Sequence, residues 1–130
     1  MKKFLGALAV LLMAFVLSVQ PAFAATFITG KAVVTDVHVT KTFYAKAGVI
    51  YLQNRNIADR EYIDIRIELY KEDGTLVQDR VGNVYDFVSR QDNPYTVPED
   101  GKYYFKLVND TPGSHWYTHY KVTDHSNFWD

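Results

Sequence analysis

The chain has 130 residues, no cysteine, and 14 Lys and Arg against 15 Asp and Glu. That length supports one domain, and the lack of cysteine excludes disulfides, thiolate metal centres and a cysteine nucleophile. A net charge of −1 gives no overall basic excess of the kind that favours nucleic acid or anionic lipid as a partner.

The first 24 residues have the pattern of a secretory signal peptide. Two lysines follow the initiator methionine, an apolar run covers 4–17, and Ala22-Phe23-Ala24 supplies the small residues of a cleavage site. The apolar run is shorter than the roughly 20 residues of a membrane-spanning helix, which disfavours a membrane anchor. We therefore expect cleavage after Ala24.

The mature domain is then 25–130, which we expect to be secreted, extracellular and without stable membrane anchoring. Loss of Lys2 and Lys3 leaves 12 basic and 15 acidic residues, so its net charge is −3. All ten tyrosines lie in this part, and such an aromatic composition is typical of β-rich cores. A cysteine-free exported chain with this signal also suggests a bacterial source.

The first half of the mature domain alternates between apolar and polar stretches. The β-branched residues of 26–44 predict two short strands, or one long strand with a bulge near Thr35. The apolar run 49–52 predicts a central strand, and the polar segment 53–61 predicts a loop.

The clearest strand follows, because one parity of it is wholly apolar: Ile63, Ile65, Ile67 and Leu69. The segment 72–75, Glu-Asp-Gly-Thr, predicts a tight hairpin turn with Gly74 at the position that requires positive φ. Residues 76–81 are the expected partner strand, and 84–88 predicts one more strand.

The segment 94–123 reads as a closing β-hairpin. Both of its strands alternate, and their apolar sides must face one core. A four-residue connection would place Leu107 opposite Trp116, and on the outer face Lys106 opposite Tyr117.

No stretch of the mature domain has helix periodicity, and turn-forming residues recur at the roughly 8–12-residue spacing of β-sandwiches. The sequence therefore predicts an all-β fold: a single antiparallel β-sandwich or jelly roll of about seven to eight strands.

Two segments carry a family resemblance, 63–75 (IDIRIELYKEDGT) and 97–108 (VPEDGKYYFKLV). A strand, an Asp-Gly turn and a later Gly-x-Tyr strand resemble the small secreted bacterial jelly-roll modules of the pre-peptidase C-terminal domain type. The resemblance covers about half of the mature chain. It implies an accessory or binding role.

The outer face of the expected hairpin is the candidate ligand-binding site. It would gather an aromatic strip with a basic edge, made by Tyr104, Tyr117, His119, Lys102, Lys106 and Lys121. Exposed aromatic rings on a sheet stack on sugars or anchor protein partners. Two alternatives stay open: another segment, such as the tail with Phe128 and Trp129, covers this face, or the rings only stabilise the sheet by cross-strand pairing.

Calcium is a possible ligand of the loop carboxylates, with Asp92, Asp100 and Asp110 as candidate metal residues, although such residues are also ordinary turn formers. His115 and His119 share a strand face about 13 Å apart, too far to chelate one zinc ion by themselves. We expect no other cofactor.

Catalytic motifs are weak. No Gly-x-Ser-x-Gly occurs, and Asp64 and Glu68, with Arg66 between them, predict a solvated ionic ladder rather than a glycosidase pair. We expect a non-enzymatic extracellular binding module for cell-wall or extracellular polysaccharide or for a protein surface, and not for nucleic acid. The alternatives are a bacteriocin-like toxin, an inhibitor or immunity protein, and a matrix protein that assembles through an open sheet edge.

Overall fold

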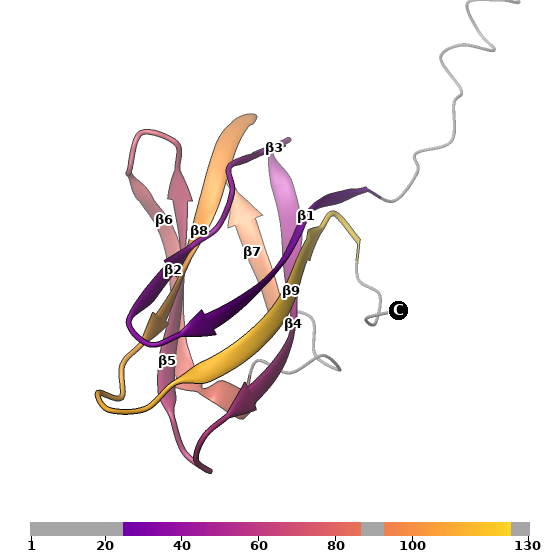
Figure 1. The fold of residues 1–130 in the computed structure, drawn as a ribbon. Helices are drawn as coiled ribbons and strands as arrows, with labels where there is room; N and C mark the ends of the chain where they lie inside the picture. The colour runs from indigo at the N-terminus through magenta and orange to yellow at the C-terminus, as the bar shows by residue number, and fades with distance from the viewer. Residues whose placement is uncertain (1–24, 87–92, 126–130) are drawn as a thin grey trace, which may run out of the picture.

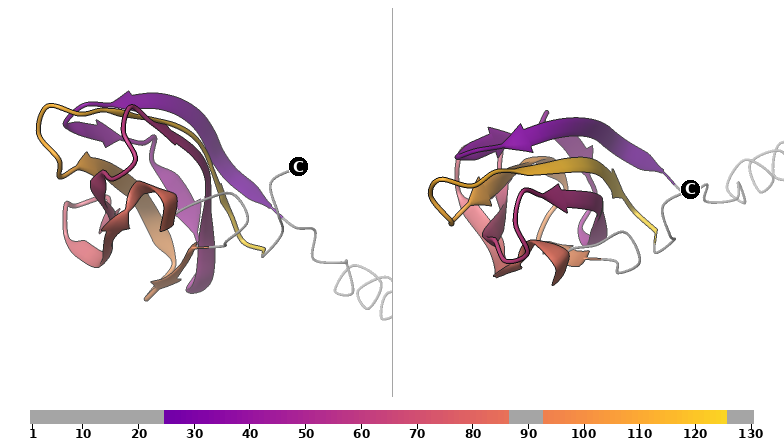
Figure 2. Two further views of the ribbon diagram at one scale, coloured as in Figure 1. Left: turned by 90° about the horizontal axis from the view of Figure 1, so that it is seen from below. Right: turned by 60° about the horizontal axis from the view of Figure 1, so that its bottom comes forward.

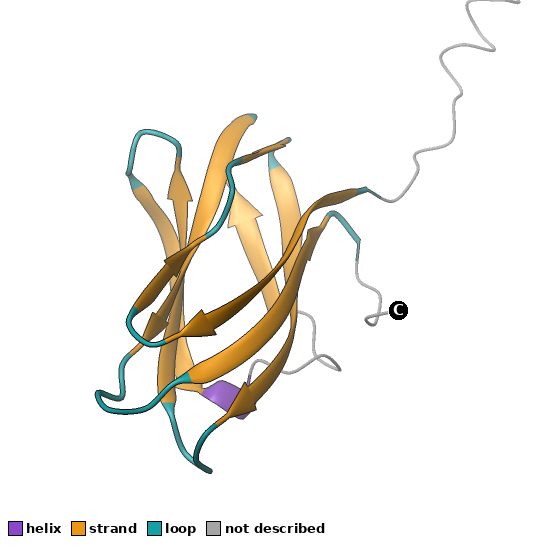
Figure 3. Cartoon of the chain, viewed as in Figure 1, coloured by secondary structure: helices purple, strands orange, loops and turns teal. Residues whose placement is uncertain are grey.

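The computed structural model describes residues 25–86 and 93–125, and in this part the chain is all-β (Figures 1 and 3). The elements are β1 (Thr26–Val34), β2 (Val37–Val39), β3 (Phe43–Ala45), β4 (Gly48–Ala58), β5 (Asp64–Lys71), β6 (Leu76–Asn83), the short 3-10 helix η1 (Val84–Asp86), β7 (Asn93–Val97), β8 (Gly101–Asn109) and β9 (Trp116–Thr123). The expected signal peptide over 1–24 lies outside the described residues. Within them, no helix is long and apolar enough to cross a membrane.

The strands form two antiparallel sheets that face each other across the core (Figure 2). Sheet A has the order β1-β9-β4-β7, and sheet B has the order β2-β8-β5-β6, with β3 also paired to β8. Among the described strands, only β5 and β6 are both consecutive and paired with each other. All other connections lead to a different neighbour or to the other sheet, and this order is that of a jelly roll.

The core lies between the sheets and is built from the inward side of each strand. Ile65, Ile67 and Leu69 on β5 are fully buried, as their alternation predicts. Trp116 on β9 is also 0% exposed and faces them from sheet A. Burial of large apolar side chains contributes about 1.5–3 kcal/mol each, so a chain without disulfides can rest on this core.

The predicted turn after β5 is confirmed. Gly74 has a φ of 92°, and its N–H donates to the carbonyl of Lys71 at 2.9 Å. The Asp73 carboxylate accepts from the Thr75 N–H at 2.9 Å. Side-chain and backbone bonds thus close a tight β5–β6 hairpin, where Gly avoids the strain that other residues have at this φ.

The predicted closing hairpin is wrong, because β8 and β9 belong to opposite sheets. Leu107 pairs with Ile67 and His38 rather than with Trp116, which pairs with Val34 and Ala58. Alternation shows which side of a strand faces the core, but strands from either sheet satisfy that condition equally. The predicted register therefore joined two strands that are not neighbours.

The crossing between β8 and β9 is held by the last residue of β8. The Asn109 Nδ2 donates to the Ser114 carbonyl at 2.8 Å and to the Thr35 carbonyl at 3.1 Å. Its Oδ1 accepts from the Thr111 N–H at 3.0 Å. One amide side chain thus ties the 110–115 loop to the turn after β1, which fixes the path from one sheet to the other.

The segment 53–58 is strand rather than loop. It completes β4, and it is polar on the inside because Asn54 and Asn56 face the interior. The Asn56 Nδ2 donates to the Val84 carbonyl at 3.0 Å, and the Asn54 Oδ1 accepts from Asn93 at 3.3 Å. Each of these two buried amides thus makes a side-chain hydrogen bond, which offsets part of the cost of removing it from water.

Two other expectations are adjusted. Residues 84–86 form η1, so the start of the predicted strand 84–88 is helical and its end lies outside the described residues. The segment 26–44 holds three strands, because β1 lies in sheet A while β2 and β3 both pair with β8 in sheet B.

Candidate functional site

The four residues predicted to bind a ligand are divided between two surfaces. Tyr104 and Lys106 lie on the outer face of sheet B, through β8, and Tyr117 and His119 lie on the outer face of sheet A, through β9. A single strip that combines all four does not exist in the structure.

On sheet B, the Tyr104 ring stacks on the ring of Tyr70, its partner on β5, with centroids 5.4 Å apart. The Lys106 Nζ lies 4.7 Å from the Tyr70 centroid. Burial raises the pKa of Tyr70, and the charge of Glu68 raises it further. The two rings and the Lys106 amine thus interact with one another, as expected for cross-strand stabilisation of the sheet.

Charges on the sheet B face are balanced. The Arg66 Nε lies 3.8 Å from Glu68 Oε2, and its Nη2 lies 3.4 Å from Asp110 Oδ1. Lys106 is paired in register with Glu68, which also neighbours Asp79 on β6. This surface is an ionic ladder. The sequence predicted its Arg66–Glu68 part, but the second carboxylate near Arg66 is that of Asp110 rather than Asp64.

The outer face of sheet A has a different character. β9 runs between β1 and β4 (Figure 1), so each outward residue of β9 has a neighbour on both sides. One row across the three strands is Lys31–His119–Arg55, and the next is Val33–Tyr117–Ile57. Lys121 follows along β9, between Thr29 and Gln53. We call this surface, made by Lys31, Val33, Arg55, Ile57, Tyr117, His119 and Lys121, the cationic face.

No outward-facing position of β1, β9 or β4 holds an Asp or a Glu. Burial lowers the pKa of His119, and the positive charges of Lys31 and Arg55 lower it further. His119 is therefore mainly neutral at pH 7, with two fixed cations beside it. The overall net charge of the chain conceals this concentration of one sign.

The apolar row of the cationic face is solvent-accessible. Val33 is 60% exposed and Ile57 is 67% exposed, on either side of the half-buried Tyr117. Exposed β-branched residues around a ring form a flat apolar step beside the charged row. Such a pairing of apolar and cationic rows is suited to an extended ligand that has both carbon surfaces and negative groups.

The predicted metal residues do not converge. Asp100 and Asp110 lie at opposite ends of β8, about 33 Å apart at ~3.3 Å per residue, so they cannot share an ion. The Asp100 Oδ1 accepts from the Ala47 N–H at 2.8 Å, and Asp110 pairs with Arg66. Asp92 lies outside the described residues. No cluster of three potential ligands occurs within 25–86 and 93–125.

Two histidines have structural contacts. The His38 Nε2 lies 3.2 Å from the Tyr120 hydroxyl between the sheets, and burial lowers the pKa of His38. The His115 Nδ1 lies 3.4 Å from the Asp59 carboxylate, in the loop before β9. Both contacts join segments that are distant in the sequence.

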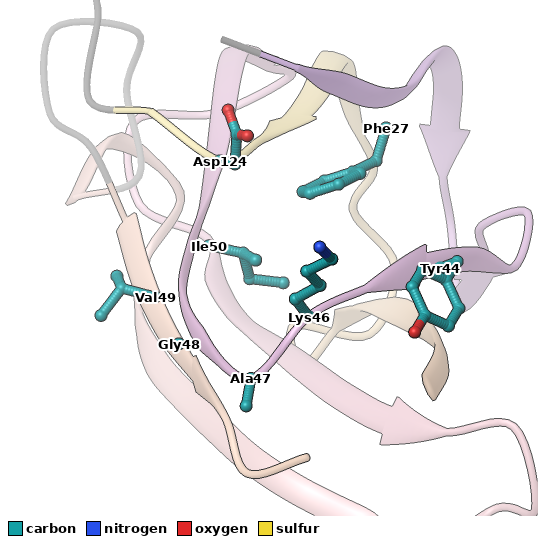
Figure 4. A pocket seen from close by; sticks show the side chains of 8 residues that line it. All are labelled: Phe27, Tyr44, Lys46, Ala47, Gly48, Val49, Ile50 and Asp124. Carbon is teal, nitrogen blue, oxygen red and sulfur yellow. The ribbon is translucent and has the colours of Figure 1, made fainter. Parts of the chain in front are cut away.

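A pocket of about 470 Å³ opens where β1 begins and β9 ends (Figure 4). Its lining comes from β1, β3, the β3–β4 connection, β4 and the residue after β9: Phe27, Tyr44, Lys46, Ala47, Gly48, Val49, Ile50 and Asp124. Phe27 stacks on Phe43 at 5.6 Å, which supports that wall. The Lys46 amine extends into the space below Phe27 (Figure 4).

Comparisons with known proteins leave the family of the chain open. No family model matches the sequence, and no curated protein matches it. The resemblance to pre-peptidase C-terminal domains therefore stays a prediction. Among solved structures, the chain is similar to one described as the structure of infectious bursal disease virus Gx strain, with a TM-score of 0.41, 13% identity, and coverage of 81% of this chain and 32% of that one.

A second similar structure is the VP2 subviral particle of the same virus, with a TM-score of 0.39, 12% identity, and coverage of 78% of this chain and 31% of that one. The chain spans about a third of the length of each.

The sequence predicted that Tyr117, His119 and Lys121 lie on one outer face, but not that Lys31 and Arg55 lie beside them. Both alternate correctly with inward residues on their own strands, and that signal was present in the sequence. It could not show that β9 lies between them. Arg55 also lies within 53–61, for which the sequence predicts a loop.

Proposed function

We propose that this chain is a secreted, non-enzymatic binding module that holds an acidic extracellular polysaccharide against its cationic face. The observation that supports this is the row Lys31–His119–Arg55, with Lys121 beside it and no carboxylate on the outward positions of the three strands. Fixed cations attract a polyanion at long range, and the apolar row beside them takes the carbon faces of sugar rings.

The expected export of the chain favours one class of polyanion over the others. A basic surface alone suits nucleic acid, acidic polysaccharide and anionic lipid alike. The predicted signal peptide sends the domain outside the cell, where acidic polysaccharide is a constant component of walls and matrices. The exposed apolar row Val33–Tyr117–Ile57 adds contact area that ring stacking uses.

The test is binding of purified 25–130 to polygalacturonate and to its fully methyl-esterified form, which has the same backbone without the charge. We expect saturable binding to the acid form that weakens with added salt, and little binding to the ester. Lys31→Gln with Lys121→Gln should weaken binding about tenfold or more, since each lost charged contact costs on the order of 1 kcal/mol.

The matched control is Lys102→Gln with Lys106→Gln, which removes the same charge from the sheet B face. It should leave binding nearly unchanged. Equal binding of acid and ester would refute charge recognition. Equal affinity for single-stranded DNA would show an unselective polyanion surface, and no binding to any of these polymers or to isolated cell walls would turn the search toward a protein target, with growth inhibition as the next assay.

A further inference from the structure

The two ends of the described domain are joined by a reciprocal pair of hydrogen bonds. The Ala25 N–H donates to Asp124 Oδ1 at 2.7 Å, and the Asp124 N–H donates to the Ala25 carbonyl at 3.1 Å. The His125 Nδ1 lies 3.1 Å from the same carboxylate oxygen. The start of β1 is thereby fastened to the end of β9, at the rim of the pocket in Figure 4.

Ala25 is also the residue that the expected cut after Ala24 would make the first of the mature chain. Its nitrogen would then be an ammonium group rather than an amide. We propose that Asp124 is the docking site for the α-ammonium group of the processed chain, so that removal of 1–24 creates an ion pair that locks β1 onto β9.

The carboxylate is prepared for a cation. Burial alone would raise the pKa of Asp124, but the hydrogen bonds from Ala25 and His125 outweigh it and lower that pKa, so the group is ionised at neutral pH. Its side chain is 39% exposed, which screens the pair only in part. An ammonium adds a full charge and further donors to a contact that the amide already makes with one N–H.

The ion pair would act on β1. β1 is an edge strand of sheet A and pairs there with β9. The register of this pairing shifts near the start of β1, between Thr26 and Ile28. The same strand carries Phe27 in the pocket wall and Lys31 in the cationic face. Removal of 1–24 would therefore stabilise β1, which supplies part of the proposed binding surface.

This inference shares with the proposed function only its export step, and its test does not use polysaccharide. The intact mass of the exported protein should correspond to a chain that starts at Ala25. Separately, 25–130 released from a fusion with a free Ala25 is compared with the same chain acetylated at its N-terminus. Acetylation keeps one N–H donor for Asp124 and removes the charge and the further donors of the ammonium group.

The measured quantity is the amide hydrogen exchange of Asp124 and Phe27. Acetylation should lower their protection by up to about fivefold, as expected for a partly exposed ion pair. In the Asp124→Asn chain, free and acetylated forms should exchange alike. A different first residue in the exported protein, or an acetylation effect that is absent or that persists in Asp124→Asn, would overturn the inference, and neither result would bear on polysaccharide binding.

Discussion

At the scale of single residues, the same side-chain types have different neighbours on the two sheets. Tyr104 and Lys106 both contact the ring of Tyr70 on the neighbouring strand. His119 instead lies between Lys31 on β1 and Arg55 on β4, and Tyr117 lies between Val33 and Ile57. Residue type alone does not distinguish a binding surface from a stabilising one. The neighbours on the adjacent strands decide it.

His119 should make binding pH-dependent. Its pKa is lowered by burial and by two adjacent cations, so it is neutral at pH 7 and becomes charged as the pH falls below its usual range near 6.5. A bound polyanion favours the charged form. We expect affinity for polygalacturonate to rise from pH 7.5 to pH 5 by up to about tenfold, the effect of one added charged contact.

The measurement is a binding isotherm at each pH, with His119→Gln as the comparison. The variant should retain the affinity of the neutral form and lose most of the pH response. An unchanged response in His119→Gln would assign it to another group.

Gly30 is needed because it faces Tyr120 across the β1–β9 pair. A Cβ at this position would overlap the ring and hydroxyl of Tyr120, which also contacts His38. Gly30→Ala should lower the free energy of unfolding in urea by about 1–3 kcal/mol, as overpacking usually does. Gly101→Ala is the control, since its Cβ would lie 3.9 Å from Tyr103. Equal stability of both variants would contradict the packing described.

At the scale of elements, the position of β9 determines which residues form the cationic face. Its position between β1 and β4 brings together Lys31 and Arg55, which lie 24 positions apart in the sequence. The β5–β6 hairpin could be predicted, because alternation and an Asp-Gly turn are both local signals. The neighbours of β8 and β9 could not, since period-two alternation is the same in either sheet and pairing between distant strands leaves no local pattern.

The strand order can be tested with cysteines, because the natural chain has none. Val33→Cys with Tyr117→Cys places two thiols on paired positions of β1 and β9, and we expect them to form a disulfide on mild oxidation. Lys106→Cys with Tyr117→Cys would be joined only if β8 and β9 formed a hairpin, and should stay reduced and monomeric. Intact mass and thiol titration distinguish these outcomes, and cross-linking of the second pair instead of the first would refute the two-sheet order.

At the scale of the whole molecule, the fold class followed from composition and turn spacing, but the distribution of charge did not. The mature net charge of −3 shows no overall basic excess, yet the strand order places Lys31, Arg55 and Lys121 on one sheet, whereas acidic side chains lie beside the cations of the other sheet. Net charge describes solubility and average attraction; the sign of one face depends on which strands are neighbours. In this domain, strand order determines which charged side chains lie together on one face.

The most direct measurement is a titration of isotopically labelled 25–130 with a short oligogalacturonate, followed by amide chemical shifts. If the cationic face is the binding surface, the shifts will concentrate at Lys31, Arg55, His119 and Lys121 and diminish with added salt, while Tyr104 and Lys106 stay unperturbed. Shifts centred on β8, or none at concentrations that saturate binding, would contradict the account.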